Sequence, residues 1–104
     1  MSKIIVHFMA GLGNQMFQYA MYKNLEERLG KDRVGANIAC IEHNGYELEK
    51  IFNIKLQTLN IANLIEIKER QTGFSFHEEY FHLPIENNYI LNGLFHFYRF
   101  CLYL

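Results

Sequence analysis

The sequence predicts an α/β fold with a parallel sheet and flanking helices. Apart from His7, the run Ile4–Phe8 is apolar and β-branched and leads into glycines, as in a strand covered on both faces. Residues 15–29 follow with apolar positions at helical spacing, and 33–40 return to a strand pattern. A strand, a glycine turn, a helix and a second strand make a βαβ unit, whose crossover is right-handed in nearly all proteins.

The predicted helix over 15–29 has recognisable ends. Asn14 is a good N-cap, because its side-chain oxygen can accept a hydrogen bond from a free N–H of the first turn. Gly30 is a good stop signal, since glycine readily adopts the left-handed conformation that ends helices. His7, inside the first strand, is expected to be a core histidine with satisfied hydrogen bonds.

The second half is less regular. Residues 43–45 predict a turn, 46–52 a short amphipathic helix, and the apolar stripe of 59–70 a further helix. Residues 74–83 fit either a strand or a helical turn.

Asn92-Gly93 interrupts the last apolar stretch. This dipeptide favours a hairpin turn between strands at 89–91 and 94–97, because both positions tolerate a positive φ. A single strand with an internal glycine is the other interpretation.

Length and composition limit the domain count and the partners. The 104 residues, half of them hydrophobic, fit one domain over 1–104 with a modest core. Ten basic and eleven acidic side chains give a net charge of −1, whereas nucleic-acid-binding domains usually have a basic excess. No nucleic-acid partner is therefore expected. No signal peptide or membrane span is expected either, since the apolar tail 94–104 is about half the ~20 residues that a span needs.

Gly11-Leu12-Gly13 lies where the first strand ends and the first helix begins. Free backbone N–H groups and the helix dipole make such a place suitable for a phosphate or another anion. Met16 stands where a dinucleotide-binding fingerprint has its third glycine, and no Gly-Lys-Ser/Thr follows. The spacing alone fits a plain connecting turn equally well.

Four stretches resemble a known family. The block from Ala10 to Ala20, Ala-Gly-Leu-Gly-Asn-Gln-Met-Phe-Gln-Tyr-Ala, closely resembles the N-terminal signature of the α-1,2-fucosyltransferases (glycosyltransferase family 11), which has Gly in place of Ala10. Residues 43–54 are similar to the family's His-Asn-Gly-Phe-Glu-Leu-Glu segment. Residues 89–100 are loosely similar to a stretch that reads Gly-Tyr-Trp-Gln in the family and Gly-Leu-Phe-His here, and Phe76–Glu79 is weakly similar too.

The resemblance implies a Rossmann-like N-terminal half of a GT-B-type glycosyltransferase, incomplete by itself. Such enzymes transfer fucose from GDP-fucose to the 2-hydroxyl of a galactoside with inversion and without a metal. The family's Arg-x-Gly-Asp donor grip does not occur in these 104 residues, so the donor-binding C-terminal domain is expected to be absent and the chain inactive alone. The implied partners are GDP-fucose, a galactoside acceptor glycan and the missing C-terminal lobe or another subunit. The implied location is cytoplasmic, with peripheral membrane attachment as a variant.

The resemblance also suggests roles for particular residues. For the donor and the cleft, backbone N–H groups come from Gly11, Gly13 and Asn14, and Gln15 is expected to bond a sugar hydroxyl. Helix capping by Asn14 and a plain exposed position for Gln15 are the structural alternatives. Gln18, one turn further on, is expected to be structural.

The acceptor is expected to contact His43, Asn44, Glu47 and His96, and of these His43 and Glu47 are weak candidates for a catalytic base. A simple turn that leads into a short helix is the alternative for 43–47. No metal site is expected, because the histidines have no common ligand spacing.

Two other function classes compete with the enzyme fragment. One is a non-catalytic carbohydrate- or nucleotide-binding module that keeps the glycine loop. The other is a truncated gene product. Binding of GDP or of galactosides by the 104 residues alone would favour the module.

Overall fold

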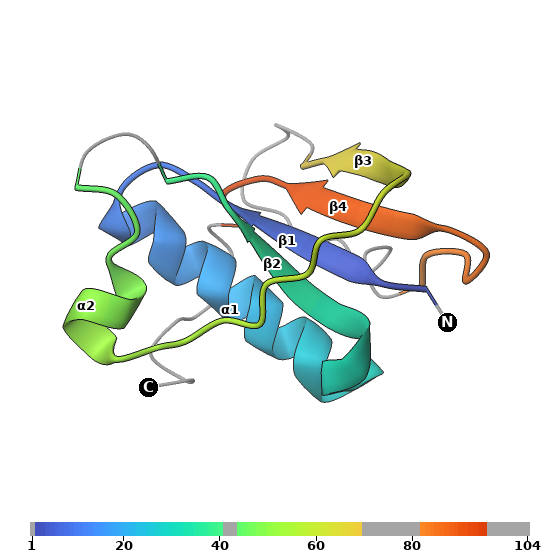
Figure 1. Ribbon diagram of the computed structural model, residues 1–104, viewed down its shortest axis with the longest axis horizontal. Coiled ribbons are helices and arrows are strands. Elements are labelled where there is room, and N and C mark those ends of the chain that lie inside the picture. The colour runs from blue at the N-terminus through green and yellow to red at the C-terminus, as the bar shows by residue number, and fades with distance from the viewer. Residues whose placement is uncertain (1, 41–43, 70–81, 96–104) are drawn as a thin grey trace.

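The computed structural model describes residues 2–40, 44–69 and 82–95. Within them the chain forms a parallel sheet with a long helix packed on one face (Figure 1). The elements in chain order are β1 (Ile4–Phe8), α1 (Leu12–Leu29), the short 3-10 helix η1 (Lys31–Arg33), β2 (Val34–Ile38), α2 (Leu48–Phe52), β3 (Leu64–Lys68) and β4 (Asn88–Asn92).

The sheet has four described strands in the order β2-β1-β4-β3, and every pairing is parallel. Val6, at the centre of β1, pairs with Ala36 on one side and with Leu91 on the other. The chain moves from β1 to β2 in one direction and places β4 on the opposite side of β1. The order therefore changes direction between β1 and β4, and this is where open parallel sheets commonly bind ligands. The expected α/β class with a parallel sheet is confirmed.

The first βαβ unit forms as predicted, but α1 begins three residues earlier than expected. Gly11 is the N-cap residue, in an extended conformation with φ −86° and ψ −178°, and its carbonyl accepts the first helical bond from Gln15 at 3.0 Å. The prediction that Asn14 caps the helix is wrong, because Asn14 already lies in the first turn. The predicted end is confirmed: Gly30 has φ 97° and its N–H donates to the Glu26 carbonyl at 2.9 Å.

The helix predicted over 59–70 is wrong. Residues 64–68 form the strand β3, in which Ile67 packs on the core and Glu66 and Lys68 are exposed. Apolar and charged residues alternate over 65–68 with a period of two, but the pattern is short, and pairing with β4 decides the conformation.

β4 follows neither interpretation of the Asn92-Gly93 dipeptide. The strand ends at Asn92 and pairs in parallel with both β1 and β3, and Gly93 and Leu94 leave the sheet. A hairpin between 89–91 and 94–97 is therefore wrong for the two described residues of its second arm. The alternatives for 74–83 fall on residues of which only 82 and 83 are described, and these two are irregular.

The core lies between the sheet and α1. Its largest fully buried side chains include Phe8, Met21 and Leu25, and Phe8 meets Tyr22 edge-on with ring centroids 6.0 Å apart. His7 faces the other way and is half-buried; its Nδ1 lies 2.9 Å from Asn37 Oδ1 on β2. The expectation of a core histidine is therefore wrong, because the parallel register places His7 beside a polar residue near the end of the strands.

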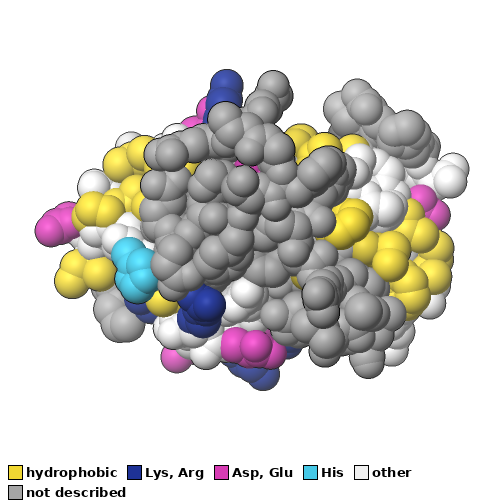
Figure 2. Space-filling model, turned by 180° about the vertical axis from the view of Figure 1, so that it is seen from behind, with side chains coloured by type: hydrophobic (Ala, Val, Ile, Leu, Met, Phe, Trp, Pro, Cys, Tyr) yellow, Lys and Arg dark blue, Asp and Glu magenta, His cyan; other side chains and the backbone are white. Residues whose placement is uncertain are grey.

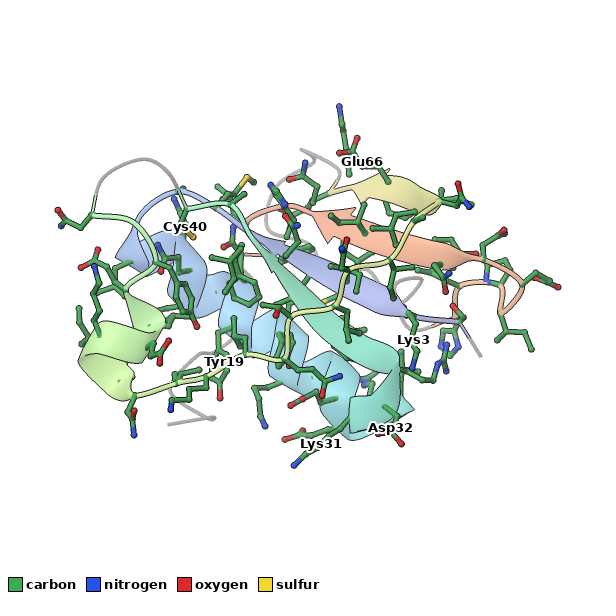
Figure 3. All side chains as sticks on the ribbon, viewed as in Figure 1. Lys3, Tyr19, Lys31, Asp32, Cys40 and Glu66 are labelled. Carbon is green, nitrogen blue, oxygen red and sulfur yellow. The ribbon has the colours of Figure 1, made fainter. Side chains whose placement is uncertain are left out.

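The two ends of the sheet differ in what they carry. Lys3 and Asp32 lie together at the amino end, where Lys3 Nζ donates to the Asp32 carbonyl, and Cys40 lies at the opposite end, just beyond β2 (Figure 3). Seen from behind, hydrophobic side chains gather at both sides of the molecule (Figure 2). The carboxyl end of the sheet is the one that holds the residues singled out in the sequence.

Candidate functional site at the carboxyl end of the sheet

A glycine loop, residues 9–13, connects β1 to α1 at the switch point. Ala10 has φ 65°, a left-handed conformation that costs about 1–2 kcal/mol in a residue with a Cβ. This reversal turns the chain sharply from the strand into the helix, so that the first turn of α1 opens at the carboxyl end of the sheet. Gly13 is exposed in that turn, and a Cβ built on it would meet no atom within 4 Å.

Gln15 is fully buried and joins the glycine loop to the segment before α2. Its Nε2 donates to the carbonyls of Ala10 and Gly45, each at 2.9 Å, and its Oε1 accepts the Glu47 N–H at 3.0 Å. All these bonds are to backbone groups. In this arrangement Gln15 positions two loops, and its amide does not face a ligand.

Gln18 is the second fully buried glutamine of α1 and makes a matching link on the other side. Its Oε1 accepts the Met9 N–H at 3.0 Å, and its Nε2 donates to the Gly93 carbonyl at 3.2 Å. The expected structural role of Gln18 agrees with this geometry. The bond from Gln18 to Gly93 could not be predicted from the sequence. The position of a residue in a helix does not indicate which distant strand end will pack beside it.

Glu69, which the sequence reasoning missed, holds the loop that follows β4. Its Oε1 accepts the N–H groups of Leu94 at 3.0 Å and Phe95 at 3.2 Å, and its own N–H donates to the Asn92 carbonyl at 2.9 Å. A Cβ on Gly93 would lie 2.5 Å from Glu69 Cβ. The bare glycine after Asn92 was the available signal, because glycine beside a strand end often marks a close approach of another chain segment.

A pocket of about 370 Å³ opens beside these links. It is lined by Met9, Lys68, Glu69, Asn92, Gly93 and Leu94. These residues follow or end β1, β3 and β4, so the pocket lies at the carboxyl end of the sheet next to the switch point. Its volume falls in the range of roughly 300–1,000 Å³ that is typical of small-molecule sites.

The candidate acceptor residues are only partly described. Glu47 is half-buried and is the N-cap residue of α2, while Asn44 is exposed. Through Gln15, the segment that holds both lies next to the glycine loop. His43 and His96 lie outside the described residues.

Burial dominates the electrostatics around this end of α1. It raises the pKa of Tyr22 to about 12 and also raises the pKa values of Tyr46 and Tyr19. Tyr46 donates its hydroxyl to the Ile54 carbonyl at 3.2 Å, and Tyr22 accepts the Gln57 N–H at the same distance. Burial raises the pKa of the Cys40 thiol as well, which keeps it protonated and poorly nucleophilic.

The described part of the chain contains neither a cluster of metal-ligating side chains nor a helix able to span a membrane. No group of three or more His, Cys, Asp or Glu side chains comes together there as a metal site would require. None of the described helices combines the length and apolarity that crossing a bilayer demands.

The fold and the carboxyl end of the sheet define the class of the protein. It is a small α/β domain whose described strands are all parallel, with a pocket of small-molecule size at their carboxyl ends. Comparison with protein-family models, with curated proteins and with solved structures found no match.

Proposed function

We propose that this chain is the acceptor-side, Rossmann-like N-terminal half of a GT-B-type α-1,2-fucosyltransferase. One observation carries the proposal. The described parts of three stretches that resemble this family, 10–20, 44–54 and 89–95, are joined by hydrogen bonds near the carboxyl end of the sheet. Gln15 of the first stretch bonds Gly45 and Glu47 of the second, and Gln18 of the first bonds Gly93 of the third.

Two further features support the proposal. The position of Ala10, where the family signature has glycine, has φ 65°, the conformation in which glycine is the least strained residue. Gly13, by contrast, has open space around it and costs α1 about 0.5–1 kcal/mol relative to alanine. Since the fold does not require a glycine at 13, close approach of a ligand is the better reason for one.

In the proposed enzyme, Gly11, Gly13 and Asn14 direct backbone N–H groups of α1 toward the donor diphosphate. The acceptor is oriented by the segment that holds His43, Asn44 and Glu47. Inverting transfer depends on placing the acceptor hydroxyl in line with the bond between fucose and phosphate, with hydrogen-bond donors on the leaving diphosphate. His43 and Glu47 are the side chains of suitable type to remove the proton.

The donor grip is supplied by a second lobe, on the same chain or on another subunit, because the 104 residues contain no Arg-x-Gly-Asp. The proposed reaction uses no metal. A cytoplasmic location, with or without peripheral membrane attachment, remains part of the proposal.

A graft tests the assignment. The 104 residues replace the matching N-terminal portion of an active α-1,2-fucosyltransferase, and fucosyl transfer from GDP-fucose to lactose is measured. Transfer by the graft, together with no GDP release by the 104-residue chain alone, is the expected result. The Gly13→Ala graft is the matched variant: it is expected to fold at least as well and to transfer about tenfold more slowly, if ligand approach is what requires the glycine.

Two results would contradict the proposal. A folded, soluble graft without transfer would remove the family assignment, and turnover by the 104 residues alone would remove the need for a second lobe. Submillimolar binding of GDP or lactose by a chain whose graft is inactive would instead assign a non-catalytic binding module.

A further inference from the structure

Hydrogen bonds from buried or half-buried side chains fix the walls of the pocket at the carboxyl ends of β3 and β4. Gln18 bonds both Met9 and Gly93, which line it from two different strands. Glu69 bonds the N–H groups of Leu94 and Phe95 through one carboxylate oxygen. Because its walls are bonded to one another, the pocket is organised before any ligand arrives.

The groups that line this pocket are mixed in character. Glu69 Oε2 accepts no hydrogen bond from a described residue. Asn92 Nδ2 donates to Glu66 Oε2 at 3.3 Å, which leaves the amide oxygen Oδ1 as the acceptor that Asn92 offers. Lys68 contributes an ammonium group, which lies 3.7 Å from Glu66 Oε1. Met9 and Leu94 add apolar surface. The lining itself has one carboxylate, Glu69, and one ammonium group, Lys68. Glu66 does not line the pocket, but its contacts with Lys68 and Asn92 place a second carboxylate at the rim.

This balance selects one chemical class of ligand. A phosphate or a diphosphate would meet an excess of negative charge, and a purely apolar ligand would leave the Glu69 carboxylate without a partner. A neutral sugar ring has hydroxyls that donate to a carboxylate and exchange bonds with a carboxamide, and it has C–H surface that packs on apolar side chains.

From this geometry we infer that the pocket lined by Met9, Glu69, Asn92 and Leu94 binds a neutral sugar ring, with sugar hydroxyls donating to Glu69 Oε2 and to Asn92 Oδ1. The inference deepens the proposed function, on which the choice of a galactoside as the probe rests. It adds a sugar-binding subsite to the proposed enzyme, on the other side of the glycine loop from the segment of Asn44 and Glu47. Glu69 and Asn92 thereby become binding residues.

The test is a titration of the isotope-labelled 104-residue chain with methyl β-galactoside, followed by backbone amide resonances, with GDP as the anionic probe. The galactoside is expected to shift the amides of Met9, Glu69 and residues 92–94, and GDP to leave them unchanged. Glu69→Gln is expected to weaken galactoside binding about tenfold, because a carboxylate is the stronger acceptor. Glu86→Gln, which changes an exposed carboxylate in the turn before β4, is the matched control and keeps full affinity.

A second measurement checks that the Glu69→Gln variant is correctly folded. In the Glu69→Gln protein the amide oxygen can still accept the Leu94 and Phe95 N–H groups, so their resonances are expected to stay close to those of the unchanged chain. Galactoside shifts confined to 44–47, GDP shifts in the pocket, or no galactoside shift at tens of millimolar would each overturn the inference. The graft experiment decides the fucosyltransferase proposal independently of all three outcomes.

Discussion

The side-chain amide of Gln18 donates to the carbonyl of Gly93, 75 residues further along the chain, at 3.2 Å. The same amide accepts the Met9 N–H through its oxygen. One buried side chain on α1 therefore satisfies backbone groups at the ends of β1 and β4, the two strands between which the sheet changes direction. The pocket wall and the glycine loop depend on this link.

Replacing Gln18 with leucine should destabilise the fold strongly. The substitution keeps a similar volume but leaves two backbone groups without a partner, the half-buried Met9 N–H and the buried Gly93 carbonyl. Each unsatisfied buried group costs about 1–3 kcal/mol, and the Met9 N–H is only partly buried, so we expect the free energy of unfolding to fall by about 2–4 kcal/mol. Urea denaturation followed by circular dichroism measures it.

Gln57→Leu is the control for this substitution, since the Gln57 side chain is exposed and the bonds given for this residue use its backbone. Its unfolding free energy should change by less than about 0.5 kcal/mol. Equal losses in the two variants would show that the buried link contributes little.

Ala10→Gly should stabilise the protein. Ala10 has φ 65°, which costs a residue with a Cβ about 1–2 kcal/mol, and part of this gain is offset because glycine is freer in the unfolded chain. A net gain of about 0.5–1 kcal/mol is expected in urea denaturation. Ala39→Gly, at a position without a positive φ, should lose stability instead, and a gain there would point to a cause other than relief of strain.

The two glycines that flank the site should respond to alanine in opposite ways. At Gly93 a Cβ would lie 2.5 Å from Glu69 Cβ, and we expect Gly93→Ala to cost about 1–3 kcal/mol. At Gly13 the space is open and the backbone is helical, so Gly13→Ala should add about 0.5–1 kcal/mol. Thermal unfolding of the two variants side by side checks this, and a loss in both would contradict the described environment of Gly13.

Stability should fall at alkaline pH. Burial raises the pKa of Tyr22 from 10.0 to about 12, so the folded chain keeps this proton while the unfolded chain releases it. The contribution to stability is fully present below about pH 10 and is lost as the pH rises from about 10 to about 12. Unfolding free energies measured over this window should show the decline.

Tyr22→Phe tests the origin of that decline. The variant loses the hydroxyl that accepts the Gln57 N–H and should be less stable at neutral pH, yet its decline above pH 10 should be shallower. Tyr46→Phe should act in the same direction, because burial raises the pKa of Tyr46 too. A decline of unchanged slope in both variants would assign it to other groups.

The βαβ unit was predictable because its signals are local. The apolar run Ile4–Phe8, the glycines after it and the stop at Gly30 each act within a few residues, and the structure forms the strand and the helix end where they indicate. β3 was predicted as a helix because a five-residue edge strand carries a weak pattern, and its pairing with β4 decides its conformation. The hairpin predicted over 89–97 was wrong, in its described residues, for the same reason. β4 pairs with β1 and β3, which come from other parts of the chain, and not with the described residues that follow Gly93.

The candidate site, too, was predictable from the sequence only in part. The sequence located the glycine loop and both glutamines, but Gln15 lies in the core instead of facing a ligand, and Glu69 was missed. Burial and partner choice depend on which segments meet, and the contacts of Glu69, Gln15 and Gln18 with Leu94, Glu47 and Gly93 join residues 25 to 75 positions apart.

By itself, then, the sequence determined that the chain forms a parallel α/β domain with a glycine loop opening its first helix. The tertiary structure alone decided that Gln15 and Gln18 link that loop to Gly45 and Gly93, and that Glu69 closes the loop after β4. The physical reason is that propensities and caps act along the chain, whereas a buried amide or carboxylate takes the partners that the packing of distant strands brings to it.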